Sequence, residues 1–269
     1  MTIVLSQGID GEETRLMQKA LNELCDYGMP SDGVFGPGTK NNLVAWQTEN
    51  GFTPDGIYNS EFHTAIADLV DRKYIRMSMV DEYANAIDLD PAFLKAVIKV
   101  ESNGSGFFNN GSCTILFERH IFYNQVVKKF GLQRAEEWAS KYPNICYKTR
   151  SQSAYLGGVR EWDRLNLAKD LDSECALMST SFGMFQIMGF NYGLCGYRNV
   201  GDYVSDAITS ERYHIGAVSM LIRNQRPWYN AAKALDFRMF ARLYNGADYA
   251  SHNYHGRLET AYHIYSKQN

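Results

Sequence analysis

The sequence lacks the patterns that mark several classes of protein. Its five cysteines are odd in number, widely spaced and without a CxxC pair, so we expect buried thiols rather than a zinc site or a disulfide framework. Its six histidines form no HExxH motif, which argues against a metallopeptidase. We therefore expect no metal and no cofactor.

Long apolar runs and a strong excess of charge are also missing. No stretch approaches the ~20 apolar residues of a membrane span. The N-terminus has neither a basic start nor a sustained apolar core, so we expect no signal peptide, no stable membrane association and synthesis in the cytoplasm. The net charge is only −3, which is too weak an imbalance to favour a nucleic-acid partner.

The charge changes along the chain in a way that indicates two domains. Residues 1–70 hold 3 basic and 10 acidic residues, and the remainder holds 24 basic and 20 acidic ones. This step predicts a boundary near residue 70, and the mildly basic second part suits an anionic polymer such as cell wall. Residues 71–86 are expected to form a connecting helix, because no Pro-rich or Gly/Ser linker separates the two parts.

The first part has a repeated pattern of helix and turn. Residues 12–24 and 39–48 carry apolar side chains at helical spacing, and each segment is followed by an Asp-Gly turn, DGVFGP and then PDGIYN. Asp-Gly favours turn conformations with positive φ. The pattern predicts a small three-helix module, although any small helical bundle would share this periodicity.

In the second part, the stretch DPAFLKAVIKVESNGSG at residues 90–106 places one carboxylate at the end of an apolar helix. Asp90 and Pro91 are typical of a helix start, and the apolar stripe that follows leads to Glu101. Ser102, Asn103 and Gly104 are expected to end the helix. A carboxyl group there is partly desolvated, which raises its pKa towards that of a general acid. The pattern alone favours the alternative, a glutamate that is solvated or paired with Lys or Arg.

Two later segments carry further candidate residues. Glu118 follows a β-prone run at residues 114–117, and it is either a second carboxylate of a cleft or a partner of Arg119 or His120. The segment TSFGMFQIMGFNYG at residues 180–193 opens with a Thr-Ser pair of the kind that caps helices. Its amide, Gln186, is expected either to bond the backbone or to face a polar ligand such as an N-acetyl sugar.

The remaining periodicity predicts mainly α structure with little β structure. The expected helices span residues 125–142, 151–168, 204–224 and 254–265.

The first 70 residues resemble the peptidoglycan-binding domain of bacterial and phage cell-wall hydrolases. The carriers of this resemblance are TRLMQKALNELCDYG, SDGVFGPGT, LVAWQ and the ending TPDGIYNSEFHTAIADL. The resemblance implies that glycan or stem peptide binds along a shallow groove, with contributions from Phe35 and Trp46. Core packing is the alternative, and more common, role for these two aromatic side chains.

From about residue 75 to the end, the chain resembles the N-acetylmuramidase domain of modular phage endolysins, within the lysozyme-like superfamily. The carriers are AVIKVESNGSGF, ILFERHIFY, SFGMFQIMGFNY and ARLYNGADYASHNYHGRLETAY. The resemblance implies that Glu101 is the catalytic acid. It also implies that Ser181 and Gln186 line the cleft and that Tyr244 and Asn245 face the acid. Glu118, in the ERH segment, is the candidate second carboxylate.

Together these observations predict a peptidoglycan-binding domain at residues 1–70 and a larger lysozyme-like catalytic domain at residues 71–269. The resemblance implies a monomeric endolysin that hydrolyses the β-1,4 bond between N-acetylmuramic acid and N-acetylglucosamine. Such an enzyme waits in the host cytoplasm and reaches the periplasm through a separate pore, a holin. Two alternatives stay open: a lytic transglycosylase that leaves 1,6-anhydro ends, and a non-catalytic wall-binding or virion protein.

Overall fold

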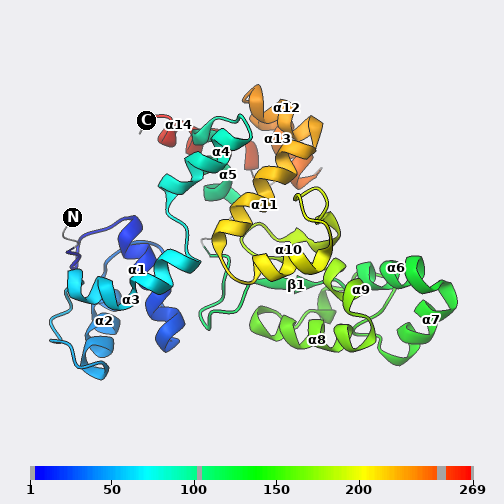
Figure 1. The fold of residues 1–269 in the computed structure, drawn as a ribbon, viewed down its shortest axis with the longest axis horizontal. Coiled ribbons are helices and arrows are strands. Elements are labelled where there is room, and N and C mark those ends of the chain that lie inside the picture. Colours follow the sequence, from blue (N-terminus) through cyan, green and yellow to red (C-terminus); the bar gives the residue numbers. More distant parts are fainter. Residues whose placement is uncertain (1–3, 102–104, 247–252, 268–269) are drawn as a thin grey trace.

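Three helices form the N-terminal module in the computed structural model, which describes residues 4–101, 105–246 and 253–267. They are α1 (Glu12–Cys25), α2 (Pro37–Glu49) and α3 (Ser60–Lys73). Figure 1 shows this module on one side of the molecule, beside the larger helical part. The predicted three-helix module is therefore confirmed.

The two Asp-Gly turns of the module are held in the same way. Gln18 of α1 accepts a hydrogen bond from the N–H of Gly33 at 2.8 Å, and Gln47 of α2 accepts one from the N–H of Gly56 at 2.9 Å. Both glycines have positive φ, 80° and 69°, a conformation that costs glycine little. The repeat in the sequence therefore corresponds to a repeated hydrogen bond, in which a helix glutamine accepts the N–H of the glycine in each turn.

The connection between the two parts differs from the predicted single helix over residues 71–86. Helix α3 continues to Lys73, the chain then runs extended, and η1 (Met77–Met79) and α4 (Val80–Ala86) follow. The helix breaks because Tyr74 and Ile75 are buried and the backbone of Ile75 bonds side chains from elsewhere in the chain. The predicted boundary at residue 70 falls inside α3 and stays a prediction.

The second part is built around α5 (Pro91–Glu101) and the last helix, α14 (Tyr254–Tyr265). Asp90 accepts a hydrogen bond from the N–H of Ala92 at 2.8 Å, which confirms the predicted helix start. Tyr262 donates to the other carboxylate oxygen of Asp90 at 2.9 Å, and Arg257 donates to the carbonyl of Val100 at 3.3 Å. Helix α14 therefore holds α5 at both ends.

A small antiparallel sheet lies next to this helix pair. Its strands are β1 (Ile115–Phe117), β2 (Thr180–Phe182) and β3 (Ile187–Met188), in that order. Leu116 lies opposite Ser181. The β structure expected near residues 114–117 is confirmed, whereas the Thr-Ser pair that resembled a helix start lies in β2.

The remaining helices make up most of the second part of the chain (Figure 1). They differ from the sequence expectation mainly at their breaks. Gly131, with φ 86°, separates two helices where one was expected over residues 125–142. The other elements are α6 (Arg119–Phe130), α7 (Leu132–Lys141), η2 (Gln152–Ala154), η3 (Gly158–Arg160), α8 (Glu161–Leu171), α9 (Ser173–Met178), η4 (Gly189–Asn191), α10 (Val200–Ala207), α11 (Glu211–Asn224), α12 (Arg226–Lys233) and α13 (Phe237–Asn245). The mainly α prediction is confirmed.

All five cysteines are free thiols. Cys113, Cys146, Cys175 and Cys195 are buried, as expected, and Cys25 is half-buried. Within the described residues, no helix has both the length and the apolar character needed to cross a bilayer.

A buried ion pair joins the two parts of the chain. Lys19 of α1 lies 2.6 Å from a carboxylate oxygen of Glu211, and the two side chains are 2% and 0% exposed. Glu211 also accepts hydrogen bonds from the N–H of Ile75 at 3.2 Å and of Gly106 at 3.0 Å. Burial acts to raise the pKa of Glu211, but the charge and hydrogen bond of Lys19, the N–H of Gly106 and the Arg15 charge outweigh it and lower this pKa. One carboxylate thus connects α1, the segment after α3 and the loop that follows α5.

We expect Lys19→Met to destabilise the whole protein by about 3–5 kcal/mol, because it leaves the Glu211 charge buried without a cation. Arg72→Met is the matched control, since it removes a cation from the exposed pair that Arg72 forms with Asp68 in α3. This change should cost less than about 1 kcal/mol. Urea unfolding at neutral pH measures both, and equal costs would show that the buried pair adds no stability.

Candidate active site

The candidate site centres on Glu101, the last residue of α5. Its side chain is half-buried, and Asn245 donates a hydrogen bond from Nδ2 to its Oε1 at 3.0 Å. Asn245 is itself the last residue of α13, and Gly246 follows it with φ 78°. Two helix C-termini therefore meet at this carboxyl group. Ser102, Asn103 and Gly104, which were expected to end α5, lie outside the described residues.

The surroundings favour the protonated form of Glu101. Burial raises the pKa of its carboxyl group above the ordinary value, and this outweighs the Asn245 hydrogen bond and the Arg257 charge, which lower it. The negative ends of two helix dipoles also disfavour a carboxylate here. Burial and the nearby Glu101 charge in turn raise the pKa of Tyr244 and of Tyr254. The carboxyl group thus lies in an apolar, aromatic environment.

Aromatic packing fixes the position of Tyr244 and Asn245 relative to α5. The Tyr244 ring stacks on Phe240 with centroids 5.7 Å apart and lies 5.1 Å from the Trp228 ring. Phe240 makes an edge contact with Phe93 of α5 at 5.0 Å. The predicted YN segment therefore does lie beside Glu101.

Ser181 of β2 and Gln186 of the turn between β2 and β3 lie together. Ser181 donates its hydroxyl to Gln186 Oε1 at 2.8 Å. The Gln186 amide nitrogen donates to the carbonyls of Gly183 at 2.8 Å and Thr114 at 3.1 Å. Of the two roles expected for Gln186, bonding to the backbone is observed. The residue is exposed and has φ 48°, a conformation held by these bonds.

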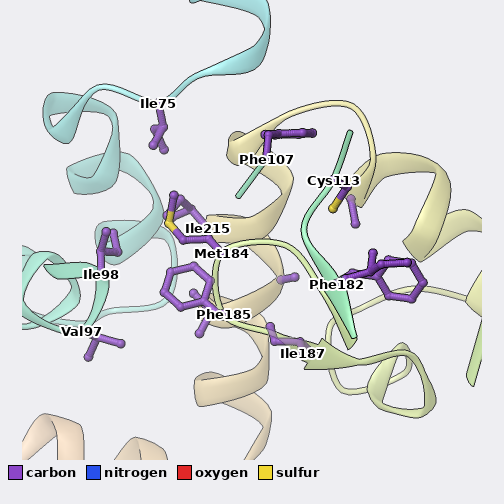
Figure 2. Packing of buried hydrophobic residues seen from close by; sticks show 14 of the residues in the cluster. Ile75, Val97, Ile98, Phe107, Cys113, Phe182, Met184, Phe185, Ile187 and Ile215 are labelled. Atoms are coloured by element: carbon purple, nitrogen blue, oxygen red, sulfur yellow. The ribbon is translucent and has the colours of Figure 1, made fainter. Parts of the chain in front are cut away.

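His214 of α11, which we did not single out from the sequence, supports this turn from behind. The ring nitrogen Nδ1 accepts the N–H of Met184 at 3.3 Å, and Nε2 donates to the carbonyl of Ala207 at 2.6 Å. Burial lowers the pKa of His214, which keeps the ring neutral in this arrangement. Figure 2 shows Met184 and Phe185 of the turn packed between Ile98 of α5 and the α11 helix.

Glu118 lies in a separate polar cluster. It accepts a hydrogen bond from the Tyr155 hydroxyl at 2.7 Å, and it lies 3.2 Å from His120 and 3.9 Å from Arg150. None of these four residues is among the groups given above that shift the pKa of Glu101. Of the two alternative partners considered for Glu118, His120 is observed. Arg119 instead donates to backbone carbonyls in the segment after α7.

Phe35 and Trp46 are part of the core of the N-terminal module. They are 1% and 6% exposed, and the Trp46 ring contacts Phe62 edge-on at 4.4 Å. The packing role accounts for both side chains. A role of Phe35 and Trp46 in wall binding stays a prediction, and the two rings expose almost no surface to a ligand. Among the described residues no group of three or more His, Cys, Asp or Glu side chains is arranged to hold a metal ion.

The chain thus combines a half-buried glutamate at the end of a central helix with a module that has repeated Asp-Gly turns. The family model described as N-acetylmuramidase matches residues 90–266, and the one described as putative peptidoglycan binding domain matches residues 10–66. The chain belongs to the N-acetylmuramidase family, and it is a peptidoglycan hydrolase with a peptidoglycan-binding module.

A solved structure agrees with this assignment. The crystal structure of the Burkholderia AP3 phage endolysin is similar to this chain with 30% identity and a TM-score of 0.68. The match covers 98% of this chain and 100% of that endolysin. No curated protein matches the chain.

We expect Gly183→Ala to disturb the turn after β2, which carries Gln186 and places it against Ser181. An added Cβ would lie 2.4 Å from the His214 ring, which hydrogen bonds hold in place. Gly157→Ala is the matched control, because Gly157 has φ 72° against 71° for Gly183 and has nothing within 4 Å of the added carbon. Strain alone should cost the control about 1–3 kcal/mol, and the clash should add about 1–3 kcal/mol for Gly183→Ala. Thermal unfolding and wall clearing measure the difference between the two variants. Equal effects would show that contact with His214 does not hold the turn in place.

Proposed function

We propose that this chain is an endolysin that hydrolyses the β-1,4 bond between N-acetylmuramic acid and N-acetylglucosamine, with Glu101 as general acid. The observation that carries the proposal is the environment of Glu101. Its carboxyl group is half-buried, receives one hydrogen bond from Asn245 and has a raised pKa. The family match and the similarity to a phage endolysin support the same substrate.

In this mechanism the protonated carboxyl group donates its proton to the glycosidic oxygen as the bond breaks through an oxocarbenium-like state. Asn245 donates to Oε1, so Oε2 is the oxygen that carries the proton in the acid form. After transfer the carboxylate is negative. The Asn245 hydrogen bond and the Arg257 charge then stabilise it, since both favour the ionised form. The same two groups thus assist proton release without preventing protonation beforehand.

We keep Glu118 as the candidate second carboxylate, in the role of base or electrostatic stabiliser. It is an acceptor for Tyr155 at the N-terminal end of α6, directly after β1. Ser181 and Gln186 are kept as candidate cleft residues, and the Ser181 hydroxyl joins the carbonyl of Leu116 in β1 to the amide of Gln186 in the turn after β2. A lytic transglycosylase would use the C6 hydroxyl of the sugar in place of water. The products therefore distinguish the two reactions.

We expect Glu101→Gln to lower the rate of peptidoglycan cleavage by roughly 10²–10⁴-fold, the usual contribution of a general acid. The amide preserves size and hydrogen bonding. Glu259→Gln makes the same change at an exposed position on α14 and serves as the matched control. Turbidity loss of permeabilised cells measures the rate. Mass spectrometry of the products should show reducing N-acetylmuramic acid ends.

Undiminished clearing by Glu101→Gln would refute the assignment of the acid. Products with 1,6-anhydro ends would show that the enzyme is a lytic transglycosylase and not a hydrolase. If the wild-type protein binds walls without cleaving them, the chain is a binding protein.

We expect the cleavage rate to fall as the pH rises through the pKa of Glu101, because only the protonated form donates. Asn245 lowers this pKa, so Asn245→Ala should raise it and move the alkaline limb of the rate profile to higher pH, whatever its effect on the maximal rate. Asn166→Ala, at an exposed position on α8, should leave the limb in place. A limb that moves to lower pH, or stays fixed, would contradict this role of Asn245.

A further inference from the structure

A groove of about 730 Å³ lies between the N-terminal module and the catalytic domain. The module contributes the start of α1 and the first Asp-Gly turn. The catalytic domain contributes Ile98 and Lys99 of α5, Met184 of the turn after β2, and Tyr265 of α14. Its volume lies within the range of ligand pockets, which form preferentially where two domains meet. None of the predicted site residues lines this groove.

The lining of the groove combines both signs of charge with an apolar surface. Arg15 and Lys99 are its cations, and Asp10, Glu12 and Asp32 are its acids. Lys99 is exposed, and within the described parts of the chain it forms no ion pair. The apolar surface comes from Val34, Ile75, Met77, Ile98 and Met184. Such a surface suits a short peptide with free carboxylates and a free amine better than it suits an uncharged sugar chain.

The groove also lies within reach of the proposed reaction. Ile98, which lines the groove, precedes Glu101 by three residues on α5, so their side chains are neighbours on the helix surface, about 4.5 Å apart along the axis. In peptidoglycan a peptide is attached to the lactyl group of N-acetylmuramic acid, the sugar whose bond Glu101 would protonate. A stem of three to five residues extends over about 10–17 Å. A stem attached to a sugar beside Glu101 is therefore long enough to enter the groove.

We propose that this groove binds the peptide stem of the muramic acid residue at the cleavage site, with Lys99 facing a stem carboxylate. The inference rests on the proposed function, because it uses the position of the cleaved sugar. It assigns the N-terminal module a direct part in substrate binding, through its Asp10–Arg15 and Pro30–Val34 segments. The sugar chain and the stem then contact different surfaces of one continuous enzyme.

The test compares two substrates, intact peptidoglycan and glycan strands from which an amidase has removed the stems. The measured quantity is the ratio of kcat/KM on intact to stripped strands. Lys99→Glu should lower this ratio about tenfold, mainly through KM, and Lys99→Met should lower it less. Lys169→Glu is the matched control, since Lys169 is an exposed lysine on α8 away from the groove, and it should leave the ratio unchanged.

A second measurement detects binding without turnover. The full-length Glu101→Gln protein, with labelled methionine methyl groups, is titrated with a soluble N-acetylmuramyl peptide. The signals of Met77 and Met184, which line the groove, should shift, and that of Met220 on α11 should not. Addition of Lys99→Glu to this protein should weaken the shifts about tenfold.

The outcomes separate this inference from the proposed function. If wild type cleaves both substrates and Lys99→Glu leaves the ratio unchanged, the groove does not bind the stem, although the hydrolase assignment stands. If wild type cleaves neither substrate, the proposed reaction fails and the methyl titration alone decides the groove. Unshifted Met77 and Met184 signals at saturating peptide would overturn the inference.

Discussion

The structure depends on one buried carboxylate, that of Glu211. A fully buried charge is costly unless cations and hydrogen-bond donors satisfy it, and here Lys19 and the N–H groups of Ile75 and Gly106 do so. Lys19 and Glu211 are 192 residues apart in the sequence. Because the pair is stable only when every donor is in place, the N-terminal module and the catalytic domain are fixed relative to each other. The peptidoglycan-binding module therefore packs directly on the catalytic domain.

The same region of α11 also holds the turn between β2 and β3, through His214. His214 follows Glu211 by three residues, so both lie on one face of the helix. Glu211 bonds the backbone of the loop after α5, and His214 bonds the turn that carries Gln186. Gly106 and Gly183 leave no room for a Cβ against the His214 ring. The loop after α5 and the turn that carries Gln186 are therefore both held by α11.

Local patterns in the sequence predicted the features that local physics determines. The Asp90-Pro91 start, the position of Glu101 at the helix end and the repeated Asp-Gly turns depend on residues within a few positions of one another. The Thr180-Ser181 pair misled because strand pairing with β1, far away in the sequence, overrides a capping pattern. The roles of His214 and Lys19 had no signal for the same reason. A lone histidine or lysine on a helix shows its partner only after the chain has folded.

Two glutamates illustrate why Glu101 is suited to acid chemistry and Glu211 is not. Glu211 is the more deeply buried of the two, yet its pKa is lowered, because the Lys19 charge and hydrogen bond, the N–H of Gly106 and the Arg15 charge outweigh the effect of burial. Glu101 is only half-buried, yet its pKa is raised, because burial outweighs the Asn245 hydrogen bond and the Arg257 charge, and no cation among the described residues lies in an ion pair with it. A paired cation, rather than the depth of burial alone, determines which form each carboxyl group favours. Burial without a paired cation raises a carboxyl pKa, and among the described residues the end of α5 combines these two conditions at Glu101.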